Sequence, residues 1–161
     1  MRIRPARHDD EPDLLLVEQE TWTTASSPVA PPVWDGTQVF FRPDRGPDGF
    51  LVAEVDDRVV GYVAVHQAMV EPAHEHVLTI DGFGVRSQAQ GRGVGRALVE
   101  AAVAVARERG GRRLTLRVLG PNVAARRVYE RCGFEVEGVQ VEEFLLDGRF
   151  VDDVLMARRL D

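Results

Sequence analysis

The stretch Gln90-Gly91-Arg92-Gly93-Val94-Gly95 decides how this chain is built. It separates an apolar run, Val77 to Val85, from an amphipathic segment that predicts a helix from about Gly93 to Arg109. Glycines at a strand-to-helix turn let backbone N–H groups close around a phosphate, with the positive end of the helix dipole behind them. The sequence therefore predicts an anion-binding turn at the start of this helix.

Two familiar glycine-rich nucleotide sites do not fit this turn. A dinucleotide fingerprint requires Gly-x-Gly-x-x-Gly, but from Gly91 and Gly93 the third glycine position holds Arg96. The only acid near the required distance, Glu108, falls inside the helix. A Walker loop requires a lysine, and the chain has none.

A second stretch, Asn122-x-x-Ala125-x-x-x-Tyr129-x-x-x-Gly133-Phe134, lies about thirty residues further on. Its first three named residues stand at i, i+3 and i+7 and so share one face of the next helix. Tyr129 then faces the glycine-rich turn. The two stretches, in this order and at this spacing, resemble the GNAT superfamily of N-acetyltransferases, and the resemblance extends over the whole chain.

The resemblance implies an acetyl-CoA-dependent N-acetyltransferase that needs no metal. It implies an α/β fold, a single domain over residues 1–161, with a mixed, mostly antiparallel sheet of about seven strands and helices on both faces. Residue patterns predict the remaining elements as a strand over 2–7, a helix from about 9 to 22, a hairpin of 50–55 and 59–66, a strand over 112–118, a helix from 121 to 133, and a hairpin of 134–146 and 149–160.

For the cofactor, the resemblance implies that backbone N–H groups from Arg92 to Arg96 hold the pyrophosphate of coenzyme A. The side chains of Arg92 and Arg96 either add charge there or are solvated surface arginines. The main chain from Phe83 to Val85 is expected beside the pantetheine and acetyl groups. The full set of expected cofactor residues is Phe83, Gly84, Val85, Gln90, Gly91, Arg92, Gly93, Val94, Gly95, Arg96, Asn122, Ala125 and Tyr129.

Glycines inside the apolar run need an explanation, because glycine weakens a strand. Gly82 and Gly84 mark either a bulge or a close backbone approach. The dipeptide Asp81-Gly82 also allows a different interpretation, a hairpin turn that would split the run.

Acetyl transfer to an amine requires a proton for the leaving thiolate and a group that takes the ammonium proton. By the resemblance Tyr129 is the acid; the alternative is a tyrosine that packs the helix on the sheet. Asp81, expected on the same face of its strand as Phe83 and Val85, is the candidate base, or else a carboxylate that anchors a bulge. His74 and His76 are weaker candidates, and they lack a nearby third ligand for a metal.

Composition limits the partners. The chain has 161 residues, a net charge of −6 and a single cysteine, Cys132, which is best explained as a small buried residue. The negative charge argues against nucleic acid, and no apolar run reaches the roughly 20 residues that span a membrane. A lone cysteine and the absence of an apolar signal core near Met1 favour the cytoplasm. The architecture is compatible with a homodimer through the C-terminal strands.

The acceptor is expected between the first helical region and the last hairpin, where aromatic rings and acids suit a cationic amine. These residues are Trp22, Trp34, Phe40, Phe41, Glu18, Glu20, Glu142 and Glu143. A small-molecule amine, such as an amino acid, a polyamine or an amine antibiotic, is the leading hypothesis. The alternatives are a protein or peptide N-terminus, and a non-catalytic module that only binds acyl-CoA.

Overall fold

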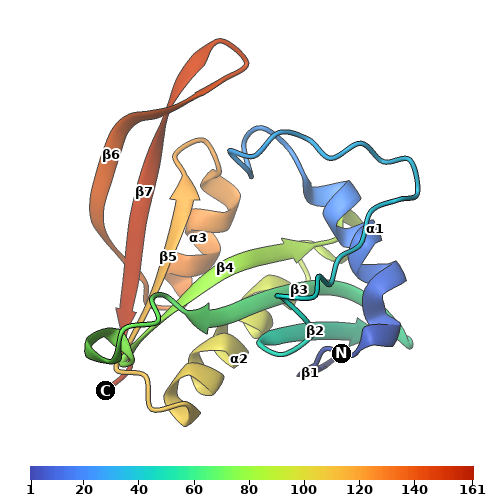
Figure 1. The fold of residues 1–161 in the computed structure, drawn as a ribbon, viewed down its shortest axis with the longest axis horizontal. Coiled ribbons are helices and arrows are strands. Elements are labelled where there is room, and N and C mark those ends of the chain that lie inside the picture. The colour runs from blue at the N-terminus through green and yellow to red at the C-terminus, as the bar shows by residue number, and fades with distance from the viewer.

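The computed structural model describes the whole chain, residues 1–161. Its strands form one seven-stranded sheet in the order β1-β2-β3-β4-β5-β7-β6 (Figure 1). All neighbours are antiparallel except β4 and β5, which confirms the predicted mixed sheet. The strands are β1 (Arg2–Pro5), β2 (Phe50–Val55), β3 (Arg58–Gln67), β4 (Val77–Val85), β5 (Arg113–Leu119), β6 (Glu135–Leu146) and β7 (Arg149–Arg159).

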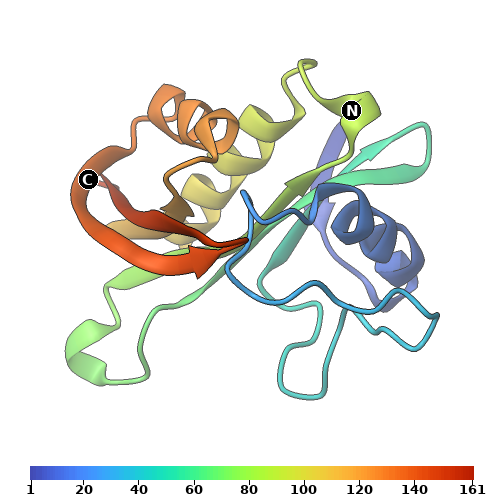
Figure 2. The same cartoon turned by 90° about the horizontal axis from the view of Figure 1, so that it is seen from above.

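The helices are α1 (Glu11–Thr21), α2 (Val94–Glu108) and α3 (Val123–Arg131). They cover both faces of the sheet, as predicted: α1 lies on one face, and α2 and α3 lie on the other (Figure 2). Each face has its own apolar core. The α1 face holds 8 buried residues around Leu14, Phe50 and Tyr62, and the α2 face holds 24 around Leu98 and Leu114.

The predicted glycine positions set the ends of the elements. Gly93 has φ of 82° and immediately precedes α2, and Gly133, with φ of 76°, follows α3. Asp147 and Gly148 both have positive φ and join β6 to β7 in a tight hairpin. Glycine adopts such angles without strain and aspartate tolerates them better than most residues, so these turns are fixed locally by the sequence. None of the helices is both long enough and apolar enough to cross a bilayer.

The parallel pair β4 and β5 stays together for only part of its length. Pairing runs from Val77 to Ile80, after which β5 pairs with β7 alone. The edge of β4 from Asp81 to Val85 on that side has no strand partner, although the other edge still pairs with β3. Figure 1 shows the two strands diverging, which leaves a wedge between them.

A bulge lies where this divergence begins. Ile80 pairs with Val65 and Gly82 pairs with Ala64, so Asp81 is an extra residue in β4. The strand is continuous, which excludes the hairpin turn at Asp81-Gly82. The bulge also corrects the predicted side of Asp81. Its carboxylate contacts residues on the α1 face, whereas Phe83 and Val85 pack in the α2 core, because an extra residue breaks the alternation of side chains.

Candidate functional site

A groove of about 420 Å³ occupies the wedge between β4 and β5. We call it the β4 groove; it is lined by Glu20, Thr21, Thr23, Ala25, Ser26, Phe83, Gly84, Val85, Gln90, Gly91, Gly95, Asn122, Ala124, Ala125 and Val128. Eight of the thirteen residues expected at the cofactor are in this set. The groove is therefore formed by the two stretches that the sequence analysis singled out, together with the end of α1.

The turn before α2 supplies free hydrogen-bond donors. No backbone N–H from Gly91 to Arg96 donates to another backbone group, and no side chain caps the helix. Such orphan donors at a helix start bind anions, helped by the helix dipole. The side chain of Gln90 holds the other end of the turn, because its Nε2 donates to the Val85 carbonyl at 2.9 Å.

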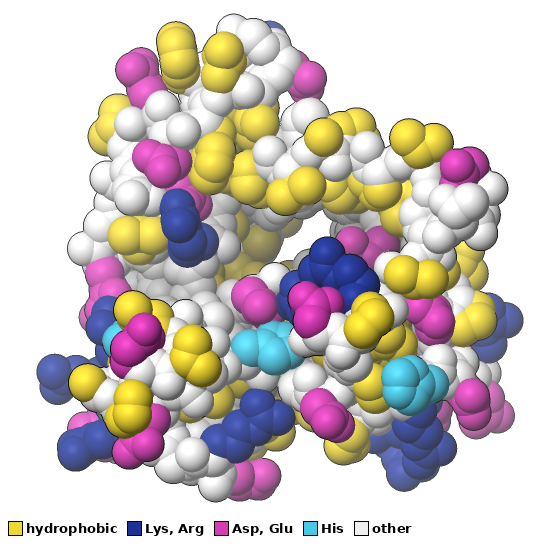
Figure 3. Space-filling view, in the orientation of Figure 1, with side chains coloured by type: hydrophobic (Ala, Val, Ile, Leu, Met, Phe, Trp, Pro, Cys, Tyr) yellow, Lys and Arg dark blue, Asp and Glu magenta, His cyan; other side chains and the backbone are white.

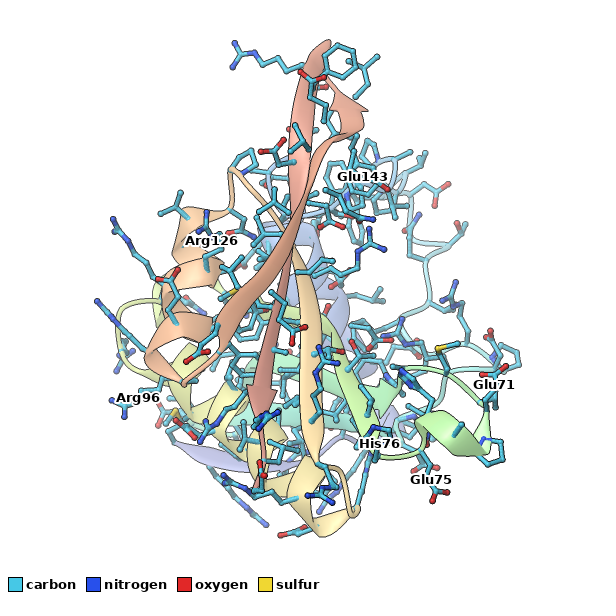
Figure 4. The ribbon with its side chains drawn as sticks, turned by 90° about the vertical axis from the view of Figure 1, so that its left-hand side faces the viewer. Glu71, Glu75, His76, Arg96, Arg126 and Glu143 are labelled. Atoms are coloured by element: carbon cyan, nitrogen blue, oxygen red, sulfur yellow. The ribbon has the colours of Figure 1, made fainter.

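Asn122 caps α3 at the opposite wall of the groove. Its Oδ1 accepts a hydrogen bond from the N–H of Ala125 at 3.2 Å. Of the expected residues outside the lining, Val94 is buried in the core and Gly93 sets the turn, while Arg92 and Arg96 are exposed. Arg96 and Arg126 lie on the helix side of the molecule in Figure 4.

Tyr129 lies behind the groove and does not line it. Its ring packs against Phe83, which does line the groove, with centroids 5.6 Å apart, and against Phe134. Burial raises the pKa of Tyr129 above its ordinary value, and no hydrogen bond contributes to that shift. The hydroxyl is thus protonated at neutral pH and free to donate.

A second pocket, of about 300 Å³, lies on the α1 face. We call it the Arg45 pocket; it is lined by Leu15, Glu18, Pro32, Trp34, Gln38, Val39, Phe40, Arg42, Arg45, Phe50, Tyr62, Asp81 and Gly82. Figure 3 shows a hollow on this side of the molecule, with apolar atoms above it and charged side chains of both signs below. Of the residues expected at the acceptor, Glu18, Trp34 and Phe40 line this pocket.

Charged pairs organise the pocket. Asp81 Oδ1 accepts a hydrogen bond from Arg45 Nη2 at 2.9 Å and pairs with His66 Nδ1 at 2.8 Å. Both contacts use Oδ1, and Asp81 Oδ2 has no partner. Across the pocket the Tyr62 hydroxyl donates to Glu18. Burial, and then the Glu18 charge, raise the pKa of Tyr62 well above its ordinary value, so this proton stays on the phenol.

The two cavities are lined by adjacent residues of β4. Gly82 lines the Arg45 pocket, and the next residue, Phe83, lines the β4 groove. The glycines of β4 allow close packing there, because a Cβ at Gly82 would lie 3.1 Å from the Tyr62 ring and one at Gly84 would lie 3.0 Å from Val17. Both explanations offered for these glycines, a bulge and a close approach, therefore apply.

Comparison with known proteins places the chain in a family. The model of the acetyltransferase (GNAT) family matches residues 12–134. The chain belongs to the GNAT family. A phosphinothricin N-acetyltransferase from Alcaligenes faecalis is 32% identical, over 99% of this GNAT chain and 82% of its own length. An L-amino acid N-acetyltransferase from Escherichia coli is 34% identical, over 67% of the chain and 66% of its own length.

A solved structure shares the GNAT fold. It is a putative acetyltransferase from Salmonella typhimurium with its cofactor acetyl-CoA, with a TM-score of 0.82, 21% identity, and coverage of 100% of this chain and 94% of the other. Several other curated relatives are longer: the chain spans 42%, 35% and 32% of the length of three of them.

Several predicted residues lie outside both cavities of this GNAT chain. His74 and His76 lie just before β4, at the end of the strand away from the bulge; Figure 4 labels His76 there. No group of three or more His, Cys, Asp or Glu is placed to share a metal ion. Trp22, Phe41, Glu142 and Glu143 line neither cavity, and Glu20 lines the groove rather than the pocket. Burial raises the pKa of Cys132 to about 11, so its thiol is not a ready nucleophile.

Among the residues missed from the sequence are Arg45 and Tyr62, which line the pocket, and His66, which pairs with Asp81 beside it. Arg45 lies in the irregular segment between α1 and β2, and Tyr62 and His66 lie on β3. Arg45 and Asp81 are 36 residues apart, and no local spacing links them. A tyrosine and a histidine in an otherwise apolar strand were the only available signal.

Proposed function

We propose that residues 1–161 form one N-acetyltransferase domain that moves an acetyl group from acetyl-CoA to the primary amine of a small molecule. The observation that carries the proposal is that adjacent residues of β4, Gly82 and Phe83, line the pocket and the groove respectively. A thioester in the groove and an amine in the pocket would come together at that point. The relatives named for phosphinothricin and L-amino acids support the same class of acceptor.

The β4 groove suits acetyl-CoA. The free N–H groups from Gly91 to Arg96 would hold its pyrophosphate, and the unpaired β4 edge from Phe83 to Val85 would bond the amides of the pantetheine arm. When bound there, acetyl-CoA supplies the activated acyl group. Asn122 and Ala125 would form the opposite wall.

Two residues of the chain would move protons. Tyr129, protonated and without a competing hydrogen bond, would donate to the leaving sulfur. Asp81 would take the ammonium proton through Oδ2, since its Oδ1 is held by Arg45 and His66. An alkylammonium has a pKa of about 10.4, so a proton acceptor at the amine is needed at neutral pH.

The alternatives make different demands. A protein or peptide N-terminus would require an open groove for the residues that follow the amine, whereas a non-catalytic module would need neither Asp81 nor Tyr129. An acceptor series lengthened from amino acid to peptide separates the first alternative from the proposal. We also propose the cytoplasm as the compartment, from the lone cysteine, and a homodimer through β6, whose Val139, Val141 and Leu145 are exposed.

The first experiment is mass spectrometry of amino acids, polyamines, aminoglycosides and short peptides incubated with acetyl-CoA and the protein. We expect one or more small amines to gain one acetyl group, and none without the protein. Binding of acetyl-CoA without any product would favour the non-catalytic module. Absence of acetyl-CoA binding would refute the assignment of the β4 groove.

A further inference from the structure

The Arg45 pocket places a cation directly beside the carboxylate that the proposed reaction uses. We propose that the acceptor is an α-amino acid with an apolar side chain, whose carboxylate pairs with Arg45 while its amine faces Asp81. This inference rests on the proposed function and assigns its substrate class and a specificity-determining residue.

Arg45 is held in one position. Its Nη2 donates to Asp81, and its guanidinium carbon lies 5.2 Å from the centre of the Phe50 ring. A cation stacked on an aromatic ring and tied to a carboxylate loses little freedom when it binds a ligand. Arg42 lines the same pocket and adds a second positive charge.

Donors of Arg45 remain unused. Its Nε is enclosed and has no hydrogen-bond partner, and Nη1 makes no hydrogen bond. An unpaired buried donor is costly, and a carboxylate supplies acceptor oxygens that match a guanidinium. Nη1 is therefore the donor that favours a ligand anion at this position, since the enclosed Nε has almost no exposed surface.

The contact between Arg45 and Asp81 limits the distance between the amine and the anionic group of a ligand in this pocket. Because the two side chains touch at 2.9 Å, an amine at Asp81 and an anion at Arg45 must lie close together. In an α-amino acid these groups are on the order of 3 Å apart, from ordinary bond lengths. A polyamine or an aminoglycoside would instead bring further cations toward Arg45 and Arg42, which is unfavourable.

The rest of the pocket suits an apolar side chain. Leu15, Trp34, Val39 and Phe40 contribute apolar lining, and the Glu18 carboxylate is engaged by Tyr62. A volume of about 300 Å³ is enough for a single amino acid and little more.

The test compares matched acceptors. L-Phenylalanine, phenethylamine and spermidine are assayed with acetyl-CoA; the first two differ only in the carboxylate. We expect kcat/KM for phenylalanine to exceed that for phenethylamine by about 10- to 100-fold, as for a hydrogen-bonded charge pair. Arg45→Gln should abolish this preference, measured within the variant as the ratio of kcat/KM for phenylalanine to that for phenethylamine. Arg45→Lys should restore part of it.

Arg113→Gln is the control, because Arg113 is also half-exposed and ion-paired, with Glu137, but lines neither cavity. It should keep the wild-type preference. Equal use of both acceptors by the wild type, or an equal loss on both in Arg45→Gln, would overturn the inference.

Direct binding separates the inference from the proposed function. Calorimetry measures phenylalanine binding to the protein saturated with coenzyme A. Binding that weakens about tenfold or more in Arg45→Gln supports the inference even if no acetylated product forms, in which case only the transfer reaction fails. No phenylalanine binding to the wild type would overturn the inference, while acetylation of another amine would leave the proposed function standing.

Discussion

The two cavities are built from different parts of the polypeptide. The β4 groove presents main chain: an unpaired strand edge, free N–H groups and glycines. The Arg45 pocket presents side chains, namely two arginines, two carboxylates and four aromatic rings. Main-chain donors are available in any sequence that adopts the fold, whereas side chains change with each substitution. The difference suggests that the groove serves the ligand shared across the family and the pocket serves the acceptor of this protein.

Replacing each of the two buried tyrosines by phenylalanine is the strongest test of this division between groove and pocket. Tyr129→Phe should lower kcat about 100-fold with every acceptor and leave the KM for acetyl-CoA nearly unchanged, because general acids contribute roughly 10²–10⁴-fold. Tyr62→Phe, which removes the hydrogen bond to Glu18, should act mainly on the KM of the acceptor. Steady-state kinetics measures kcat and both KM values. Similar changes in the two variants would mean that the groove and the pocket do not have separate roles.

Substitution of a glycine by alanine tests whether the groove binds its ligand through main-chain N–H groups. Gly93 and Gly110 lie at opposite ends of α2, have φ of 82° and 78°, and have open space around the position of a Cβ. Alanine at either should lower the free energy of unfolding by about 1 kcal/mol through backbone strain. Only Gly93→Ala should also weaken acetyl-CoA binding, by about tenfold, since it shifts the N–H groups that follow. Calorimetry and urea unfolding measure both effects; equal affinities would contradict the proposed phosphate site.

Asn122 offers a smaller effect on the same groove. Asn122→Ala removes the cap of α3 and should lower the free energy of unfolding by about 1 kcal/mol. Asn122→Asp keeps an acceptor for the cap and should retain stability, but its negative charge beside the groove should weaken binding of the phosphate-bearing cofactor. Loss of stability in both variants would show that the carbonyl oxygen is not the capping atom.

The smallest effect is expected where α1 meets the end of β4. Hydrogen bonding from Arg86 lowers the pKa of Glu20 from its ordinary value, so the charged form stabilises the folded state. This contribution is complete above about pH 4.5 and is lost as the pH falls through the folded pKa. Glu20→Gln should therefore cost about 0.2–1 kcal/mol at pH 7 and progressively less as the pH is lowered below the ordinary pKa of the carboxyl, measured by urea unfolding.

Glu71→Gln is the control for that measurement, because Glu71 is exposed and makes no ion pair. Its free energy of unfolding should match the wild type at each pH. A Glu20→Gln variant with the same profile would show that the ion pair adds nothing to stability where α1 meets the end of β4.

The sequence predicts the groove far better than the pocket, for a physical reason. Positive φ at Gly93 and Gly133 and the capping of α3 by Asn122 are local properties, so residue type and spacing are enough to predict them. Arg45, His66 and Asp81 come together only through the tertiary fold, from a loop and two strands. The side of Asp81 was predicted wrongly because regular alternation was assumed across the bulge. A signal for that bulge was present: apolar residues fall at Leu78 and Ile80, and then at Phe83 and Val85, one position out of phase.

The extra residue of the bulge makes β4 tolerant of one kind of shortening. With Asp81 deleted, Ile80, Phe83 and Val85 would still fall on one face under plain alternation, and Gly82 would keep its place opposite Ala64. The strand therefore does not need Asp81 in order to pack. The extra residue of β4 supplies only a carboxylate. A chain of 160 residues that lacks Asp81 should still form the sheet, but Arg45 and His66 would have no common partner.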